Sequence, residues 1–251
     1  MFYAYLQRFA TFLLYCVNGN AHYHHMERLP DQDENIILVS PHRTWWDPVY
    51  LAYSTRPRKY VYMAKQELFK NRALGWFIKM CGAFPIDRKN PGQAAIKYPV
   101  QMLKKSHRSL IMFPSGSRHS NDVKGGVAII AKMGKVRIVP AVYGGPRHFS
   151  GFIKGQRVDM NYGQPIDISD IKRMNDEGIE EVSRRLQEAF DQLDAENASL
   201  TASEGLRIFW WIIRIPLGIL ALVLTLLTVL FSFFASFIWD PDQHRQKEIN
   251  H

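Results

Sequence analysis

The segment from Ile215 to Trp239 runs for twenty-five residues without a charged side chain. As a helix it would extend roughly 37 Å at a rise of ~1.5 Å per residue, enough to cross a hydrocarbon core of about 30 Å. Trp210 and Trp211 precede the run and Trp239 closes it, where amphipathic indole rings settle at membrane interfaces. We therefore predict a C-terminal transmembrane helix within residues 207–240.

A polar tail, residues 241–251, follows this helix. Arg207 and Arg214 lie on the N-terminal side of the run, as the positive-inside tendency prefers for a cytoplasmic domain. The tail also carries Arg245 and Lys247, so charge alone leaves a single crossing and a hairpin both open. We expect the chain at the cell membrane, with its main domain on the cytoplasmic face.

The N-terminal segment, residues 1–30, is a weaker membrane candidate. Its apolar residues recur at spacings of three and four, which indicates an amphipathic helix. Such a helix either lies in the membrane interface or packs onto the core of the domain, and the pattern is typical of both. The stripe consists of Phe2, Tyr5, Leu6, Phe9, Phe12, Leu13 and Cys16.

Between these segments, residues 31–200 alternate short apolar runs with helical patterns. Continuous apolar runs favour strands buried on both faces, and their alternation with helices favours a largely parallel sheet. The predicted fold is α/β, with a single mixed, largely parallel sheet flanked by helices. The predicted strands are Ile36–Val39, Lys59–Met63, Ala83–Ile86, Leu110–Phe113, Val136–Val142 and Arg157–Tyr162. The predicted helices begin at Asp47, Gln66, Gln93, Gly125 and Glu177.

Positive charge is concentrated in one part of the chain. Between Arg56 and Arg108 there are thirteen Lys or Arg and two acidic residues, Glu67 and Asp87. A field of this kind attracts an anionic membrane surface, phosphorylated substrates or an acidic carrier protein. Nucleic acid is disfavoured as a partner, because no base-reading module is recognisable. The histidines at 22, 24 and 25 lack a Cys or acid at ligand spacing, so we expect no metal.

The loop after the first buried strand contains a histidine and an aspartate five residues apart, His42 and Asp47. Acyl transfer to a hydroxyl needs a base that titrates near neutral pH, and imidazole has a suitable pKa. A carboxylate at this spacing can orient the imidazole and stabilise its protonated form. The alternative is that Asp47 only caps the helix that Pro48 continues.

Two sequence blocks, one in this loop and one later in the chain, resemble those of a known family. His42 and Asp47 match an H-x-x-x-x-D motif, and residues 113–118 read Phe-Pro-Ser-Gly-Ser-Arg. Together they resemble the glycerolipid acyltransferases, the family that includes 1-acylglycerol-3-phosphate acyltransferases. A further block, Gly82 to Arg88, and the pair Val139-Pro140 match the same family in the same order. The resemblance spans about residues 36–165.

The resemblance implies roles for individual residues. His42 is implied as the general base and Asp47 as its partner, while Arg88 and Arg118 are implied to bind the acceptor phosphate, as guanidinium groups do bidentately. Ser115 stands where the family usually has Glu, which leaves the exact acceptor open. The remaining implied substrate-binding residues are Ser115, Gly116, Ser117 and Lys124.

The resemblance also implies a reaction. An acyl chain would pass from an acyl thioester, acyl-ACP or acyl-CoA, to the free hydroxyl of 1-acylglycerol-3-phosphate (lysophosphatidic acid). The product would be phosphatidic acid, in phospholipid biosynthesis, and no cofactor is implied beyond the thioester co-substrate. Two alternatives stay open: another lysophospholipid or glycerol-3-phosphate as the acceptor, and a non-catalytic lipid-binding membrane protein.

Overall fold

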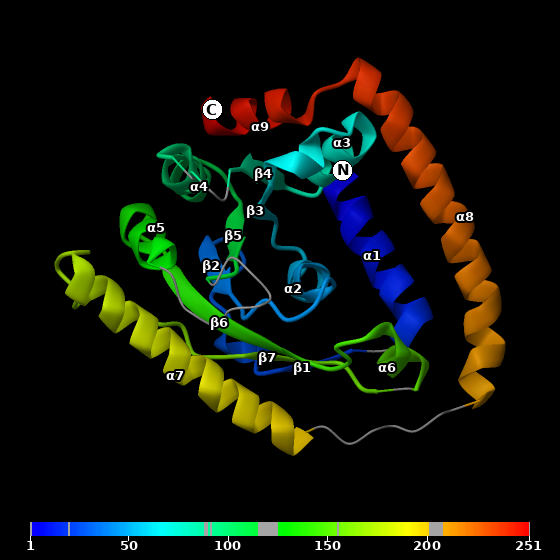
Figure 1. The fold of residues 1–251 in the computed structure, drawn as a ribbon, viewed down its shortest axis with the longest axis horizontal. Helices are drawn as coiled ribbons and strands as arrows, with labels where there is room; N and C mark the ends of the chain where they lie inside the picture. The colour runs from blue at the N-terminus through cyan, green and yellow to red at the C-terminus, as the bar shows by residue number, and fades with distance from the viewer. Residues whose placement is uncertain are drawn as a thin grey trace.

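The computed structural model shows a mixed sheet covered by helices on both faces (Figure 1). It describes residues 2–19, 21–87, 90, 92–114, 125–154, 156–200 and 208–250. Within these residues the sheet has the strand order β1-β7-β6-β2-β5-β3-β4. The strands are β1 (His22–His24), β2 (Ile36–Val39), β3 (Tyr60–Lys65), β4 (Ala83–Ile86), β5 (Ser109–Met112), β6 (Arg137–Gly144) and β7 (Asp159–Tyr162).

All neighbouring strands are parallel except β6 and β7, which are antiparallel. The prediction of a mixed, largely parallel sheet is therefore confirmed. The carboxyl ends of β2 to β6 meet at one edge of the sheet, which is the edge where ligands bind in open α/β folds.

The helices that follow the strands enclose two hydrophobic clusters. Alternate side chains of one strand point to opposite faces of a sheet, so Ile37 and Val39 join one cluster and Ile36 and Leu38 the other. The first cluster lies under α4 (Ala94–Lys105), α5 (Gly126–Gly134) and α7 (Asp176–Leu200). The second lies under α1 (Phe2–Asn18), α2 (Asp47–Ser54) and α6 (Phe149–Ile153).

Three more helices complete the described chain. They are α3 (Arg72–Met80), α8 (Ile208–Ile238) and α9 (Pro241–Asn250). In Figure 1, α8 runs along the outside of α1, and α9 turns back towards α4. The apolar C-terminal helix is thus confirmed: its segment Ile212–Ile238 is long and apolar enough to cross a membrane, by length and composition.

The N-terminal helix is also present, and α1 packs between α2 and α8. Leu6 and Cys16 of the predicted apolar stripe are buried, and so is Gln7, whose side-chain amide donates to the carbonyl oxygens of Ala52 and Arg58, both at 3.0 Å. Because these contacts tie α1 to the domain, its stripe faces protein along at least part of its length.

The sequence patterns missed three local features. His22–His24 forms the edge strand β1, in which the His24 ring lies 2.7 Å from the buried Asp159 carboxylate. The helix predicted from Gln66 is broken: the short 3₁₀ helix η2 (Gln66–Phe69) is followed by α3, whose N-cap Asn71 accepts from the backbone N–H of Leu74. The helix α6 was not predicted at all.

Candidate active site

His42 and Asp47 lie together in the loop between β2 and α2. The His42 Nδ1 atom is 3.6 Å from Asp47 Oδ2, and the Asp47 carboxylate is fully buried. His42 Nδ1 is buried and makes no hydrogen bond. A separation of 3.6 Å is slightly beyond hydrogen-bonding distance, and such contacts commonly shorten when substrate binds. The geometry therefore allows Asp47 to orient this imidazole.

Asp47 also folds the loop that carries His42. Its Oδ2 atom accepts hydrogen bonds from the backbone N–H groups of Arg43 (2.6 Å) and Thr44 (2.8 Å), and its Oδ1 atom accepts from the Thr44 hydroxyl. These donors all precede the helix, and α2 has no side-chain cap. The interpretation of Asp47 as an N-cap is therefore wrong, because its carboxylate turns back to the loop instead of forward to the first helical turn.

The neighbouring Arg43 ties the same loop to α7. Its guanidinium donates two hydrogen bonds to the carboxylate of Asp194, with Nη1 2.6 Å from Oδ1 and Nη2 closer still to Oδ2. These bonds to Asp194 raise the pKa of Arg43 above its usual value, so the guanidinium stays charged. The sequence analysis did not identify Arg43 or Asp194, because they are 151 residues apart and no motif connects them.

The family block at residues 113–118 begins beside His42. The rings of His42 and Phe113 stack with centroids 4.3 Å apart and planes 29° from parallel. The contact follows from the sheet: β2 and β5 are parallel neighbours, with Val39 paired to Met112, so the loops that leave them start side by side. On the other side of β2, Val39 is paired with Pro140 of β6. Three of the four family blocks therefore meet at the centre of the sheet.

The remaining block, around Gly82, leads into β4 at the edge of the sheet. Gly82 has φ +102°, and a Cβ there would lie 2.2 Å from the Tyr60 carbonyl oxygen, so only glycine fits. β4 is three strands away from β2, which is roughly 14 Å at the usual spacing between strands.

All six predicted phosphate-binding residues lie outside the described residues. These are Arg88, Ser115, Gly116, Ser117, Arg118 and Lys124. Gly125, which follows Lys124, is explained by packing: a Cβ there would lie 2.5 Å from the side chain of Ile179 in α7. The roles of the six residues stay predictions.

The two tryptophans of the loop have different environments. Trp46 donates its indole N–H to the Tyr143 hydroxyl at 2.9 Å and packs edge-on against Phe152 of α6. Trp45 is 76% exposed. Trp46 therefore fixes the loop against the domain, whereas Trp45 is an exposed residue of the same loop.

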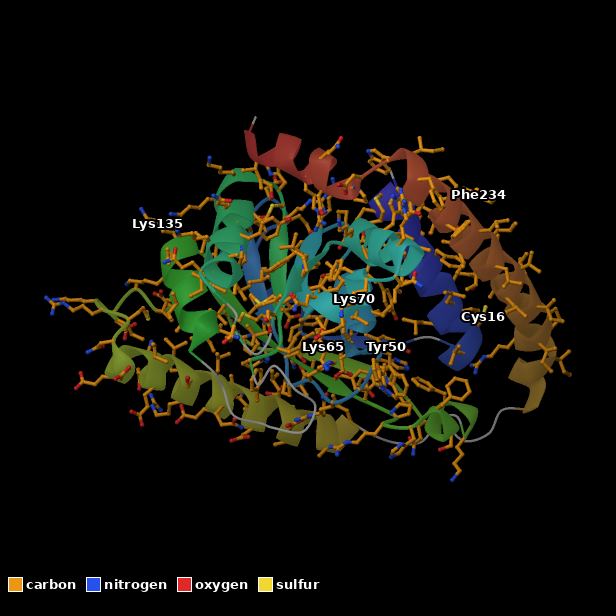
Figure 2. The ribbon with its side chains drawn as sticks, turned by 45° about the horizontal axis from the view of Figure 1, so that its top comes forward. Cys16, Tyr50, Lys65, Lys70, Lys135 and Phe234 are labelled. Carbon is orange, nitrogen blue, oxygen red and sulfur yellow. The ribbon has the colours of Figure 1, made fainter. Side chains whose placement is uncertain are left out.

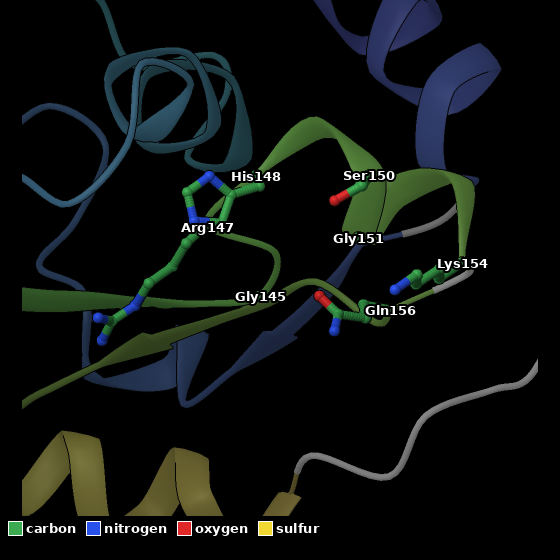
Figure 3. Close-up of a pocket in the computed structure, with 7 residues that line it drawn as sticks. All are labelled: Gly145, Arg147, His148, Ser150, Gly151, Lys154 and Gln156. Carbon is green, nitrogen blue, oxygen red and sulfur yellow. The ribbon is translucent and has the colours of Figure 1, made fainter.

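A basic pocket lies just beyond the end of β6 and was not predicted from the sequence. Its volume is 280 Å³, and Figure 3 shows its lining residues. Arg147, His148 and Lys154 line it together with the polar side chains of Ser150 and Gln156. The only sequence signal was the basic pair Arg147 and His148, which follows the predicted strand Val136–Val142. The pocket can accommodate an anionic group at the same edge of the sheet as His42.

These features define an α/β enzyme that carries a histidine and an aspartate at the carboxyl edge of a mostly parallel sheet. The family model described as Acyltransferase matches residues 20–144. The chain belongs to this acyltransferase family and is an acyltransferase, as its motifs predict.

Two curated relatives agree with this assignment. A 1-acyl-sn-glycerol-3-phosphate acyltransferase of Streptococcus pneumoniae is 61% identical over 98% of this chain and 94% of its own length. The enzyme of the same name from Bacillus subtilis is 35% identical over 71% of this chain and 92% of its own length.

A solved structure shares the fold. The crystal structure of the 1-acyl-sn-glycerophosphate (LPA) acyltransferase PlsC from Thermotoga maritima superposes with a TM-score of 0.53 at 22% identity. The match covers 73% of this chain and 78% of that one. At this identity the likeness establishes the arrangement of sheet and helices.

Proposed function

We propose that the chain transfers an acyl group from an acyl thioester to the free hydroxyl of 1-acylglycerol-3-phosphate, forming phosphatidic acid. The observation that carries the proposal is the position of His42, held between the Asp47 carboxylate and the Phe113 ring. The names of the Streptococcus pneumoniae and Bacillus subtilis relatives support the acceptor.

His42 acts as the general base in this reaction. Its Nδ1 atom faces Asp47, which leaves Nε2 to take the proton from the acceptor hydroxyl. The alkoxide oxygen attacks the thioester carbonyl, the carbon–sulfur bond breaks, and the departing thiolate takes the proton back from the imidazolium. The alcohol itself is the nucleophile, so the reaction needs no acyl-enzyme intermediate. Asp47 stabilises the imidazolium while it carries the proton.

Arg88 and Arg118 bind the acceptor phosphate in this proposal, with Lys124 and the 115–117 backbone beside them. The resemblance of their sequence blocks to those of the family supports these roles, and both arginines follow strands whose carboxyl ends share the edge that carries His42. A guanidinium pair neutralises a phosphate dianion and fixes its orientation. No metal or cofactor is required, since the thioester supplies the activated acyl group.

The acyl donor is an acyl carrier protein or a CoA thioester. Both are anionic, and the basic window from Arg56 to Arg108 favours their approach. Because these thioesters are cytosolic, we place the catalytic domain on the cytoplasmic face of the cell membrane, beside an anionic lipid surface. The apolar helix α8 supports the membrane association.

A panel of donors and acceptors tests the proposal on detergent-solubilised protein. Lysophosphatidate, other lysophospholipids and glycerol-3-phosphate are each offered with acyl-ACP and with acyl-CoA. We expect turnover with lysophosphatidate. Preference for another acceptor would favour the alternative that Ser115, in place of the family's usual Glu, keeps open.

The same assay tests the base. His42→Ala should lose about 10²–10⁴-fold in kcat, the usual contribution of a general base. His107→Ala is the matched control, because His107 is exposed and precedes β5, at the opposite edge of the sheet. Near-normal turnover by His42→Ala would rule out the mechanism, and equal losses in both variants would indicate damage to the fold.

A further inference from the structure

The long apolar helix α8 is attached to the acyltransferase domain along one side and exposed on the other. Its outer side chains, spaced three or four residues apart, are about half exposed or more, and the outward-facing Phe234 is labelled in Figure 2. This outer stripe consists of Ile212, Ile215, Ile219, Leu222, Leu226, Val229, Phe233 and Phe237. The inner side of α8 packs against α1 and α3.

Polar and aromatic contacts hold the inner side of α8 at several positions along the helix. The Tyr5 hydroxyl of α1 lies 3.0 Å from the Thr228 hydroxyl, which is in the middle of α8. Phe2 contacts Phe231, with ring centroids 5.7 Å apart. Near the start of α8, the Arg214 guanidinium lies against the backbone of Gly19. The helix α8 therefore runs antiparallel to α1 and is held beside it from Arg214 to Phe231.

The C-terminal end of α8 is held equally closely, by α3. The Trp76 indole donates to the Trp239 carbonyl oxygen at 2.8 Å, and Arg72 Nε donates to the Ser236 carbonyl oxygen at 3.1 Å. The Arg72 guanidinium also lies over the Phe237 ring, 4.3 Å from its centroid. These residues belong to the same domain as His42.

The chain beyond α8 returns to this domain and becomes part of its core. Arg245 of α9 is 4% exposed and donates to the carbonyl oxygen of Ala83 in β4 at 2.8 Å. Ile249 is 7% exposed and belongs to the hydrophobic cluster under α4. Lys79 of α3 forms an ion pair with Asp242 at 2.5 Å. These contacts give α9 a specific position on the domain.

We propose that α8 lies in the plane of the membrane, immersed in one leaflet. Both of its ends then lie on the same side of the bilayer as the acyltransferase domain. The helix is continuous from Ile208 to Ile238 and does not reverse. It follows α7 of the domain and leads into α9 of the same domain, so a crossing would place α9 on the wrong side of the bilayer. The sequence alone predicts a transmembrane helix and leaves a single crossing and a hairpin both open, because composition does not record where α9 docks.

Lipid is the occupant that the outer stripe fits. A protein partner would meet a surface with a polar rim and hydrogen-bonding groups, whereas the hydroxyl groups along α8 bond to their own helix. Thr225, Ser232 and Ser236 donate to the carbonyl oxygens of Ala221, Thr228 and Phe233, each at 2.7 Å. Internal satisfaction of polar groups is what a helix in hydrocarbon requires. Arg72, exposed beside Phe237, is placed to meet anionic headgroups.

Thiol labelling tests the side on which α9 lies. In a chain with Cys16 and Cys81 replaced by Ala, single cysteines are placed at Gln243 of α9 and at Asp191 of α7, both exposed. We expect a membrane-impermeant maleimide to label both sites in inverted vesicles and neither in right-side-out vesicles. Labelling on opposite sides would overturn the proposal. Retention of the variants in the membrane fraction confirms that they are folded and inserted.

Depth measurements test the orientation independently. A fluorophore is attached to single cysteines at Ile215, Leu226 or Phe234, in vesicles of phosphatidylglycerol and phosphatidylethanolamine with spin-labelled lipids. An in-plane helix predicts similar quenching at all three sites, at about 5–10 Å below the headgroups. If the fluorophore at Leu226 lay much deeper than those at the other two sites, the helix would cross the membrane and the proposal would be overturned. Absence of lipid quenching at all three sites would indicate a second protein copy and also overturn it.

Discussion

Arg43, the residue that follows the proposed general base His42, is joined to Asp194 of α7 by two parallel hydrogen bonds. Asp194 lies on a helix that covers the opposite face of the sheet from α2, so this pair connects the His42 loop to the far side of the domain. Planar pairs of this kind are more directional than a single ion pair. We conclude that Arg43 and Asp194 position the loop and do not themselves touch the reacting atoms.

Asp194→Asn tests this positioning role. The amide can accept only one of the two hydrogen bonds, so the loop loses part of its anchor, and small misplacements of a catalytic group cost up to about 10²-fold in rate. We expect a lower kcat with little change in either KM, measured by steady-state acyl transfer. Asp191→Asn on the same helix is the control and should behave as the parent protein. Unchanged kcat in Asp194→Asn would contradict the positioning role.

The buried carboxylate of Asp47 has two tasks, and a substitution affects both. Asp47→Asn keeps the side-chain shape, but its amide nitrogen must replace either Oδ2, which accepts from the N–H groups of Arg43 and Thr44, or Oδ1, which accepts from the Thr44 hydroxyl. We expect both a lower kcat and a loss of roughly 1–3 kcal/mol in the free energy of unfolding, followed by activity assay and thermal denaturation.

Thr44→Val separates the two tasks of Asp47. It removes the hydroxyl, which donates to Asp47 Oδ1 and accepts from the Asp47 backbone N–H at 3.2 Å, and it leaves the contact of Asp47 with His42 in place. We expect a lower Tm but near-normal kcat. A loss of kcat in Thr44→Val as large as that in Asp47→Asn would mean that loop shape, and not the His–Asp contact, limits the rate.

Much of the fold was predictable because its strands are buried on both faces. Ile36–Val39 and Ala83–Ile86 were predicted with the bounds that the structure has. His22–His24 was missed because an edge strand of polar residues has no apolar run, and it forms only by pairing with β7, far along the chain. The break before α3 depends on a single side-chain bond from Asn71, which periodicity does not reveal.

The part of the candidate site that could be predicted is the set of loops that follow the parallel strands. Once β2, β5 and β6 are parallel neighbours, the loops after Val39 and Met112 have to meet. The Arg43–Asp194 pair and the packing of α9 through Arg245 were not predictable, because each joins residues more than 150 positions apart by one specific contact. Sequence patterns report periodicity and spacing, and such contacts leave no trace in either.

The environment of Cys81 leads to a prediction about its reactivity. Burial raises the pKa of the Cys81 thiol to about 12, so the thiol stays protonated at pH 8. The thiolate is the reactive form, and alkylation by iodoacetamide should therefore be slow in the folded protein and become faster as the pH rises. Peptide mass spectrometry measures the rate. Labelling at pH 8 as fast as in the denatured protein would contradict this placement.

The acceptor phosphate provides the last prediction, which rests on Arg88 and Arg118. A hydrogen-bonded charged group contributes roughly 1.5–3 kcal/mol, so losing either guanidinium should raise the acceptor KM by about 10- to 100-fold. The donor KM should change much less, because the phosphate being held belongs to the acceptor. Lys104→Ala, an exposed cation near the end of α4, controls for the loss of general positive charge. Equal increases in both KM values for Arg88→Ala or Arg118→Ala would indicate that the arginine attracts both anionic substrates as part of the basic surface. An unchanged acceptor KM would show that the arginine does not bind the acceptor phosphate.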